Sequence, residues 1–552
     1  MKLIFNKEKK RFECLSTYEE RLIPKDVNFY WDGNSKRWWH TKPEFAIKLR
    51  EYASPECEAY FNLILEEKKE KVEESHLNNS NITILAPEGL EYLPFQKAGI
   101  EFISKRNNVL LADEMGLGKT IIALGYINLN PNLKHILIIC PASLKLNWKR
   151  EAEKWLINKL SIDVVNSIET KLDSSNIVII NYDILKKFHK ELRKIEWDLL
   201  VCDEVHKIKS WKALRTKEVI GGKGIPPLKA KKKLFLTGTP ILNHPIEIWT
   251  SVHFLAPKEF DNFWHFTRQY CNAQQTKYGM DLSGTNNLEE LNERLRASVM
   301  LRRLKADVLP ELPPKRRQII ELNMNGFSSL IKKEQEIWER ETNKVEKLRK
   351  ELEKLQAEKE NELYKEQVKK LRNAKFAAFT EISRIRHETA VAKVPLVIEF
   401  IEDLFEEDEN KKLVVFAHHH DVINLISERF KDCCVVLTGE TSIQNRQEAV
   451  DRFQNDLKAK LFVGSITAAG VGITLTASSH VIFAELDWVP ANIFQCEDRC
   501  HRIGTVESVL IQHLVFDGSI DANIAKKLLV KQEMIEKALG DVKKDDIMED
   551  II

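Results

Sequence analysis

One stretch of the sequence combines a glycine-rich turn with a lysine and a hydroxyl group, a pattern typical of phosphate binding. The turn Gly116–Thr120 follows the apolar run Val109–Ala112 and precedes an apolar helical segment. A strand, turn and helix in this order let backbone N–H groups and a helix N-terminus surround a phosphate, with Lys119 at its outer oxygens and Thr120 on Mg²⁺. Asp113 stands where the general pattern has its first glycine, so the turn needs support from other motifs.

Two adjacent carboxylates give that support. Asp203 and Glu204 end the apolar run Leu199–Cys202. In this arrangement Asp203 would hold the magnesium shell and Glu204 would polarise an attacking water. The alternative is a strand that merely ends in acids, and the phosphate loop earlier in the chain disfavours it.

A pair of arginines supplies the third chemical group. Arg499 and Arg502 are three residues apart, and therefore lie on one face of a helix. Two guanidinium groups from a second domain would stabilise the charge that develops when a γ-phosphate is transferred. The alternative is a pair of surface arginines balanced by neighbouring acids. Together the three motifs predict hydrolysis of a nucleoside triphosphate in a cleft between two domains.

The elements that position these residues follow an alternating pattern. Short apolar runs alternate with helical segments from about Ile82 to Arg317 and again from about Val394, which predicts two arrays of βαβ units with parallel sheets. Ligands in such sheets gather at the carboxyl ends of the strands. The expected strands are Asn108–Ala112, His135–Cys140, Ile177–Asn181, Asp198–Cys202, Lys233–Leu236, Leu413–Ala417, Val435–Leu437, Leu461–Gly464, His480–Ala484 and Leu510–Val515.

Composition divides the chain further. We expect a small basic and aromatic N-terminal module at 1–52, a helical linker at 53–81, a first lobe at 82–317 with a helical protrusion at about 245–300, a helical insertion at 318–393, a second lobe at 394–530 and a C-terminal tail at 531–552. The insertion is rich in Lys, Glu and Leu with apolar residues at helical spacing. This pattern favours an exposed helical hairpin over a dimerising coiled coil.

Charge and cysteine content exclude several classes of protein. The 85 Lys and Arg residues nearly balance 83 Asp and Glu residues, which argues against a wholly basic coat and requires any nucleic-acid site to be local. No apolar run approaches the roughly 18 residues that cross a membrane, so we expect an intracellular protein without a membrane partner. The nine cysteines lack paired zinc-site spacing, which favours reduced, buried thiols over metal binding.

From Leu93 to Gly540 the motifs resemble those of the Snf2 family of superfamily 2 helicase-like ATPases. Pro94–Gln96 is similar to the adenine-reading Gln motif, and Gln495–Gly504 is similar to motif VI. Within the family, Arg268–Lys305 most resembles the HepA-related (HARP) annealing-helicase branch. Val205 and Thr505 depart from the common pattern, but neither stands at a group that touches phosphate.

The resemblance implies a fold, cofactors and sites. It implies an α/β fold of two tandem RecA-like parallel-sheet lobes with helical insertions and a small N-terminal α+β module, with ATP and Mg²⁺ as cofactors. The implied nucleotide-binding residues are Gln96, Asp113, Glu114, Met115, Gly116, Leu117, Gly118, Lys119 and Thr120. The implied catalytic residues are Lys119, Asp203, Glu204, Gln495, Arg499 and Arg502, with Thr120 and Asp203 on Mg²⁺. The residues expected at the DNA backbone are Ser143, Asn147, Trp148, Thr239, Ser465, Thr467, Gly470 and Trp488.

The function that this resemblance implies is that of a DNA-dependent ATPase. It would move along duplex DNA as a monomer and remodel or reanneal forked or branched DNA in replication or repair. One alternative is a strand-separating helicase on DNA or RNA. Another is an ATP-gated DNA-binding scaffold without turnover, which the presence of Lys119, both acids and both arginines disfavours. The location would be cytoplasmic or nucleoid-associated in a bacterium or phage, and nuclear in a eukaryote.

The aromatic residues of the N-terminal module leave two interpretations open. Trp31, Trp38 and Trp39 lie beside Lys36 and Arg37. Flat rings and cations together can stack on an unpaired base at a DNA junction. They can equally form the dense core that a very small domain needs.

Overall fold

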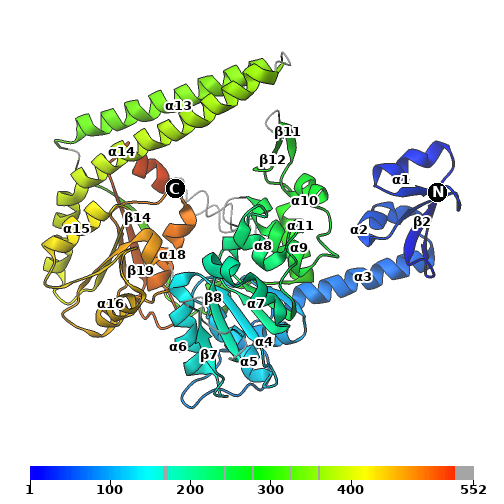
Figure 1. Cartoon of the computed structure of the whole chain (residues 1–552), viewed down its shortest axis with the longest axis horizontal. Helices are drawn as coiled ribbons and strands as arrows, with labels where there is room; N and C mark the ends of the chain where they lie inside the picture. The colour runs from blue at the N-terminus through cyan, green and yellow to red at the C-terminus, as the bar shows by residue number, and fades with distance from the viewer. Residues whose placement is uncertain are drawn as a thin grey trace. The chain divides into compact units, whose positions relative to one another are not determined.

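The computed structural model describes residues 1–165, 172, 175–241, 244–276, 279–323, 325–357, 361–470, 472–526 and 528 (Figure 1). It divides into two compact units, the first formed by Met1–His76 with Arg296–Ser298 and the second by the rest of the chain. The predicted C-terminal tail, residues 531–552, lies outside the described residues. Within the described part, no helix is long and apolar enough to cross a membrane.

The first unit contains the predicted α+β module. Its strands are β1 (Lys2–Asn6), β2 (Arg11–Leu15), β3 (Tyr30–Asp32) and β4 (Arg37–His40), which form an antiparallel sheet in the order β1-β2-β4-β3. Its helices are α1 (Leu22–Asp26), α2 (Pro43–Ala46) and α3 (Pro55–Glu74). The Ser54 hydroxyl caps α3 by accepting from Cys57 N, and Pro55 occupies the first turn. Both interpretations of the tryptophans keep support, because Trp38 packs against the core while Trp31 is 53% exposed.

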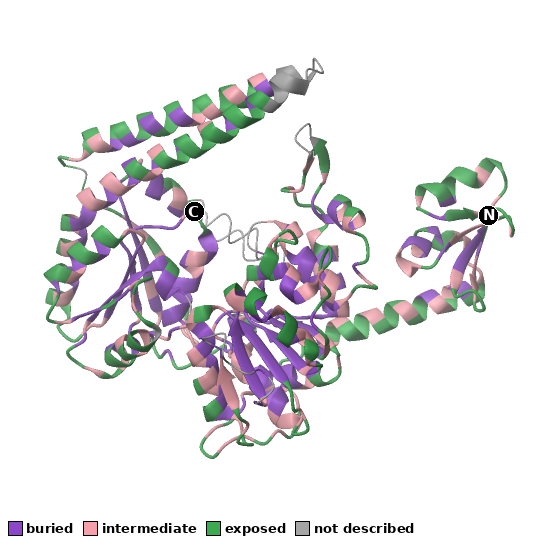
Figure 2. Ribbon diagram, in the orientation of Figure 1, coloured by how far each residue is buried: buried purple, intermediate pink, exposed green. Residues whose placement is uncertain are grey.

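A parallel sheet forms the centre of the first lobe. Its strands are β5 (Asn108–Leu111), β6 (Ile136–Cys140), β7 (Ile162–Val164), β8 (Ile177–Asn181), β9 (Trp197–Cys202), β10 (Ala230–Leu236) and β13 (Met300–Leu301). They lie in the order β13-β5-β10-β9-β6-β8-β7. Helices cover both faces of this sheet, and its central strands β6, β8 and β9 are mostly apolar and buried (Figure 2), whereas β7 is half-buried and β10 carries three lysines.

Helices and one hairpin surround this sheet. They are α4 (Pro94–Ser104), α5 (Lys119–Leu129), α6 (Lys145–Trp155), α7 (His189–Lys194), α8 (Leu214–Ile220), α9 (Trp249–Leu255), α10 (Phe263–Tyr270), β11 (Gln274–Thr276), β12 (Gly279–Asp281), α11 (Leu288–Ser298) and α12 (Lys305–Val308). The elements α9 to α11 occupy the segment where we expected a helical protrusion.

The second lobe is built on another parallel sheet. Its strands are β14 (Lys315–Glu321), β15 (Leu413–Ala417), β16 (Cys434–Leu437), β17 (Leu461–Ser465), β18 (His480–Phe483) and β19 (Val509–Val515), in the order β14-β19-β18-β15-β17-β16. Its helices include α15 (His420–Arg429), α16 (Ile443–Asn455), α17 (Ile466–Ala469) and α18 (Pro490–Cys500). The predicted fold of two tandem RecA-like lobes is confirmed.

One predicted boundary is wrong. We placed the end of the first lobe at residue 317 and the start of the helical insertion at 318, but β14 pairs with β19 in the second sheet. The strand β14 lies at the edge of the sheet and is half-buried. Its many charged residues give it the composition of a loop in the sequence. Ile319 and Ile320 nevertheless pack against the two cores of the second lobe. The chain therefore crosses between the lobes before residue 315.

The helical insertion forms a long hairpin of α13 (Ser328–Ala357) and α14 (Asn361–Glu407), which lie side by side in Figure 1. At its base, Ile337, Ile382 and Ile385 pack with Ile520 of the second lobe. Beyond that base α14 continues into the lobe, where its segment 390–404 is part of the core. The hairpin is thus one continuous body with the second lobe.

Candidate functional site

A cavity of about 460 Å³ opens between the two lobes at the carboxyl ends of β5 and β9. Among the residues that line it, the first lobe contributes Gln96, Met115, Gly116, Gly118, Lys119, Thr120, Asp203 and Glu204. The second lobe contributes Gly472, Thr474, Arg499, Arg502 and Ile503. The fold thus brings the predicted loop, acid pair and arginines to one place.

The glycine-rich loop is closed tightly at its helix. Gly118 is the residue before α5 and has a left-handed backbone with φ of 77°, which glycine adopts without strain. A Cβ atom there would lie 2.7 Å from Gln96 Nε2. Lys119 Nζ donates hydrogen bonds to the carbonyl oxygens of Asp113 at 2.8 Å and Glu114 at 3.1 Å. Burial lowers the pKa of Lys119, and the charge of Glu204 opposes this shift.

The side chain of Asp113 does not face the cavity. Asp113 Oδ2 pairs with Arg303 Nη2 at 2.5 Å, and its Oδ1 accepts from Arg303 N at 3.0 Å and Nε at 3.1 Å. Both side chains are buried. The carboxylate of Asp113 is therefore not available to a nucleotide, because a buried guanidinium pairs with it, and only the backbone of Asp113 remains a candidate for the predicted contact. This pairing also explains why an acid replaces the usual glycine.

Two other residues of the loop also point elsewhere. Glu114 Oε2 accepts a hydrogen bond from Lys305 N at 2.7 Å. Leu117 is fully buried and packs with Phe95 and Leu309. Their side chains support the loop, and only their backbone groups remain as candidates for phosphate contact.

The acid pair is held from two sides. Asp203 Oδ2 accepts a hydrogen bond from Trp148 Nε1 at 2.8 Å, and Asp203 Oδ1 accepts from Glu204 N at 2.9 Å. Glu204 has a left-handed backbone with φ of 50°, and its Oε2 lies 3.3 Å from His206 Nδ1. Burial and the neighbouring Glu204 charge raise the pKa of Asp203 to about 6. Burial by itself would raise the pKa of Glu204. The neighbouring His206 and Lys119 outweigh this effect, so the pKa of Glu204 is lowered.

The arginines face the acids from the second lobe. Arg499 Nε donates to the Gln495 carbonyl at 3.0 Å, and Arg502 Nε donates to the Asp498 carbonyl at 2.8 Å. Burial lowers the pKa of both guanidinium groups, and the charge of Glu204 opposes this. These bonds fix both arginines near the cavity. Gln495 itself is buried. Its backbone carbonyl accepts the hydrogen bond from Arg499, so its contacts give it the role of positioning that arginine.

Trp148 was predicted to touch DNA, and this prediction is wrong. The side chain is fully buried in the core of the first lobe, and its indole N–H is used by Asp203. No base or phosphate can reach it there. Trp148 instead positions an acid of the cavity.

The other predicted DNA residues are distributed over both lobes. Ser143 and Asn147 line a cavity of about 210 Å³ together with Arg446 of the second lobe. Ser465 is buried, and its hydroxyl lies 3.2 Å from that of the exposed Thr467.

Thr239, Gly470 and Trp488 are placed differently. Among the described residues, the buried Thr239 Oγ1 has no hydrogen-bond partner. Gly470 is buried, and a Cβ atom there would lie 2.7 Å from the Ile466 carbonyl oxygen. Trp488 is half-buried against the base of the hairpin.

Sequence reasoning missed a cation that joins the lobes. Lys305 of the first lobe is buried, and its Nζ donates to Asp498 Oδ1 and to the His501 carbonyl, both at 2.7 Å. Lys315 Nζ lies 2.6 Å from the same Asp498 carboxylate. Lys305 therefore connects the loop residue Glu114 to the helix that carries Arg499. The sequence did contain a signal for this contact, because three cations stand close together in 302–305, directly after an apolar strand. Cations that are buried in this way require acidic partners elsewhere in the chain.

Comparison with known proteins agrees with this geometry. The model of the SNF2-related domain matches residues 63–377, and that of the helicase conserved C-terminal domain matches residues 393–504. The human protein named DNA annealing helicase and endonuclease ZRANB3 is 34% identical over 468 residues, covering 80% of this chain and 40% of that protein.

One further relative and one solved structure are also similar to this chain. The Xenopus tropicalis protein named SWI/SNF-related matrix-associated actin-dependent regulator of chromatin subfamily A-like protein 1 is 35% identical over 440 residues, covering 78% of this chain and 43% of that protein. A solved Sulfolobus solfataricus SWI2/SNF2 ATPase core in complex with dsDNA is 24% identical and covers 83% of this chain and 96% of that one, with a TM-score of 0.38.

The chain spans about two fifths of the length of the two named relatives. The first of these relatives, whose name is DNA annealing helicase and endonuclease ZRANB3, bears out the predicted resemblance to the annealing-helicase branch. The SNF2-related model covers more than half of the chain, and the motifs that suggested it line one cavity. The chain belongs to the SNF2-related domain family.

Proposed function

We propose that this chain is an ATP-dependent DNA translocase that remodels or reanneals forked or branched DNA in replication or repair. The observation that carries the proposal is the cavity itself, in which Lys119, Asp203 and Glu204 of one lobe face Arg499 and Arg502 of the other. A site divided in this way couples the state of a bound nucleotide to the approach of the lobes. An intracellular location and action as a monomer complete the proposal.

The cavity fits ATP and Mg²⁺ in size and in charge. Its volume of about 460 Å³ lies within the usual range for small-ligand sites. Three cations that line the cavity, the buried Arg499 and the half-buried Lys119 and Arg502, provide the positive charge that a triphosphate needs. Thr120 and Asp203 supply the oxygen ligands that Mg²⁺ prefers. When bound, the metal would neutralise phosphate charge.

The residues of the chain would divide the chemical work. The N–H groups of Gly116–Thr120 and Lys119 would hold the phosphates, and Gln96 would lie toward the base. Glu204 would orient the attacking water, since its pKa is lowered and the carboxylate is ionised at neutral pH. Arg499 and Arg502 would stabilise charge on the transferred phosphoryl group.

Contacts with DNA would be made to its backbone. A motor that moves along any sequence must bind phosphates rather than base edges. Ser143 and Asn147 of the first lobe and Thr467 of the second offer polar groups for that purpose. When the arginines leave the cavity after hydrolysis, the second lobe would shift its contacts relative to the first. The name of one relative, DNA annealing helicase and endonuclease ZRANB3, supports DNA with strands that can be reannealed as the substrate.

The test measures ATP turnover with forked DNA, with plain duplex and without DNA. Turnover should rise severalfold with DNA, and Glu204→Gln should abolish it while ATP binding persists. Equal rates with and without DNA would contradict the translocase. A displaced-strand assay separates reannealing from strand separation, and turnover in the wild type excludes the scaffold.

A further inference from the structure

Two phenylalanines on α14 are exposed where a soluble helix would normally carry polar residues. Phe376 is 75% exposed and Phe379 is 56% exposed. The buried residues Leu371, Ala378 and Ile382 lie on another face of the helix, the one that packs into the hairpin and its base. The two phenyl rings therefore point away from the hairpin core. Scattered single apolar residues are ordinary, but adjacent aromatic rings on one face indicate binding.

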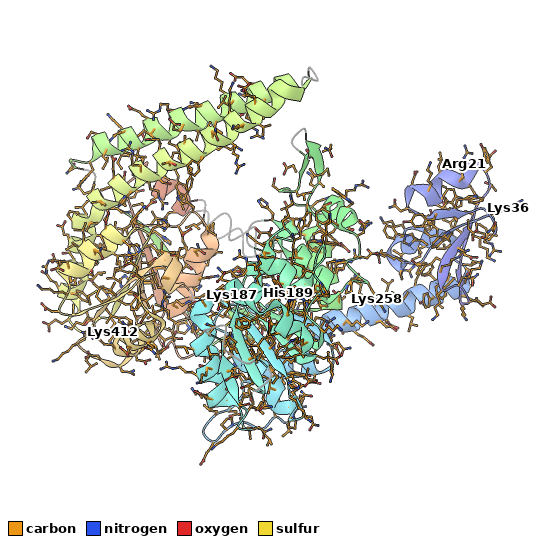
Figure 3. All side chains as sticks on the ribbon, in the orientation of Figure 1. Arg21, Lys36, Lys187, His189, Lys258 and Lys412 are labelled. Carbon is orange, nitrogen blue, oxygen red and sulfur yellow. The ribbon has the colours of Figure 1, made fainter. Side chains whose placement is uncertain are left out.

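Unpaired cations accompany the rings. Lys369, Arg372 and Lys375 are exposed on the turns beside Phe376. At about 100° per residue, Lys369 and Arg372 fall within about 40° of Phe376 around the helix, and Lys375 lies about 40° from Phe379. Within the part of the chain that is described, no acidic side chain pairs with any of these three cations, whereas the neighbouring Lys370 pairs with Glu366 at 2.9 Å. Side chains project from both helices of the hairpin in Figure 3. We refer to Lys369, Arg372, Lys375, Phe376 and Phe379 as the ledge.

The ledge is fixed to the second lobe. The ring of Phe379 lies 6.1 Å from that of Trp488, and the Arg386 guanidinium lies over Trp488 at 4.6 Å. Arg386 is held in turn by Asp521 at 2.7 Å and by the Leu486 carbonyl. Because these partners are buried, the aromatic surface is preorganised. Binding to it would cost little conformational entropy.

The combination selects one class of ligand. Flat apolar rings bind other flat apolar faces, and unpaired cations bind a polyanion. Single-stranded nucleic acid has both, with bases that stack on aromatic side chains and phosphates that attract cations. Paired bases in a duplex are stacked on each other and offer no free face. A protein partner would have to be both apolar and strongly acidic, which is a narrower requirement.

We propose that the ledge stacks on unpaired bases of the single-stranded arm of a DNA fork, while its three cations contact the phosphates of that arm. This inference rests on the proposed function, since it assumes that DNA is the substrate. It adds a device by which the protein distinguishes a fork from plain duplex. A base stacked on an aromatic side chain increases affinity by about fivefold to 150-fold.

The experiment compares the full chain with the double variant Phe376→Ala/Phe379→Ala. Fluorescence anisotropy would measure binding to a single-stranded oligonucleotide, a fork with a single-stranded arm, and plain duplex. We expect the variant to lose at least about fivefold in affinity for the first two and to bind plain duplex unchanged. Duplex-stimulated ATP turnover should also stay unchanged, because neither residue lines the cavity described above.

Two further variants separate stacking from other apolar contacts. Phe376→Trp/Phe379→Trp keeps flat rings and should retain the affinity. Phe376→Leu/Phe379→Leu keeps apolar volume without rings and should behave like the alanine variant. Substituting Lys369, Arg372 and Lys375 by Gln should reduce the salt dependence of single-strand binding by about two units of slope.

Several results would overturn the proposal. Equal affinity of wild type and alanine variant for the fork would do so. So would full affinity in the leucine variant, which would show that the contact with DNA needs apolar volume but no aromatic ring. A change in oligomeric state with unchanged DNA affinity would assign the rings to a second copy of the chain. If wild-type turnover were the same with and without DNA but single-strand binding still required the two rings, the proposal for the ledge would be supported. The proposed translocase function would then be contradicted.

Discussion

Replacing Trp148 by Phe tests whether a buried indole controls the metal chemistry of the cavity. The change keeps an aromatic ring in the core of the first lobe, and it removes the N–H that donates to Asp203 Oδ2 at 2.8 Å together with part of the buried ring volume. Asp203 is the proposed Mg²⁺ ligand, and this bond fixes which of its oxygens faces the cavity. Without it the carboxylate can turn, and its charge is less well stabilised.

The magnitude follows from the bond. A hydrogen bond to a charged group contributes about 1.5–3 kcal/mol, which corresponds to roughly 10-fold to 150-fold in an equilibrium constant. Loss of a residue that orients a metal ligand typically weakens metal affinity or activity by about 10-fold to 100-fold. We therefore expect the Mg²⁺ concentration that half-activates ATP turnover to rise by about 10-fold to 100-fold.

A matched control is available in the same lobe. Trp197 is also fully buried, but its indole N–H donates to the Leu192 carbonyl at 3.0 Å rather than to an acid. Trp197→Phe should cost stability without changing the requirement for Mg²⁺. Turnover would be measured against free Mg²⁺ at saturating DNA, with thermal unfolding recorded for both variants. An unchanged half-activating concentration in Trp148→Phe, with the protein folded, would refute the proposed role of the bond.

Two other substitutions test contacts outside the metal site. Asp113→Asn should lower the stability of the first lobe by about 3–5 kcal/mol, because the buried Arg303 loses its counter-charge; urea unfolding measures this, and partial recovery is expected when Arg303→Met is added. Gly472→Ala should reduce turnover by at least about fivefold, because its φ of 78° disfavours a side chain and a Cβ atom would lie 2.4 Å from Leu144 Cδ2 of the first lobe. Gly439→Ala, where a Cβ atom would meet nothing within 4 Å, is the control, and equal losses in both variants would contradict a specific contact between the lobes.

Local rules made much of the cavity predictable. The phosphate loop needs glycine where the backbone is left-handed and a lysine at the start of the helix, and both requirements are visible in the sequence. The acids follow a buried strand directly, so the sheet topology alone carries them to the loop. The arginines follow from their spacing on a helix.

Contacts between distant residues were not predictable. Asp113 and Arg303 are 190 residues apart, and nothing near either one shows that they pair. Trp148 lies beside the expected DNA residues in sequence, and only the packing of α6 on the sheet reveals its burial. The strand β14 has the composition of a loop because its charges are neutralised by acids of helix α18, where Arg317 pairs with Glu497 at 2.6 Å.

The continuity of α14 from hairpin to lobe makes it a lever arm. The helix has 47 residues, and its segment from Ala390 onward is embedded in the second lobe. At about 1.5 Å per residue, Phe376 stands about 21 Å out from Ala390. With Ala390 as the pivot, a lobe rotation of about 10° would sweep Phe376 through about 3.7 Å, close to the 3.4 Å rise of one base pair. A small angular change at the cavity would thus become a displacement on the scale of a single nucleotide at the hairpin.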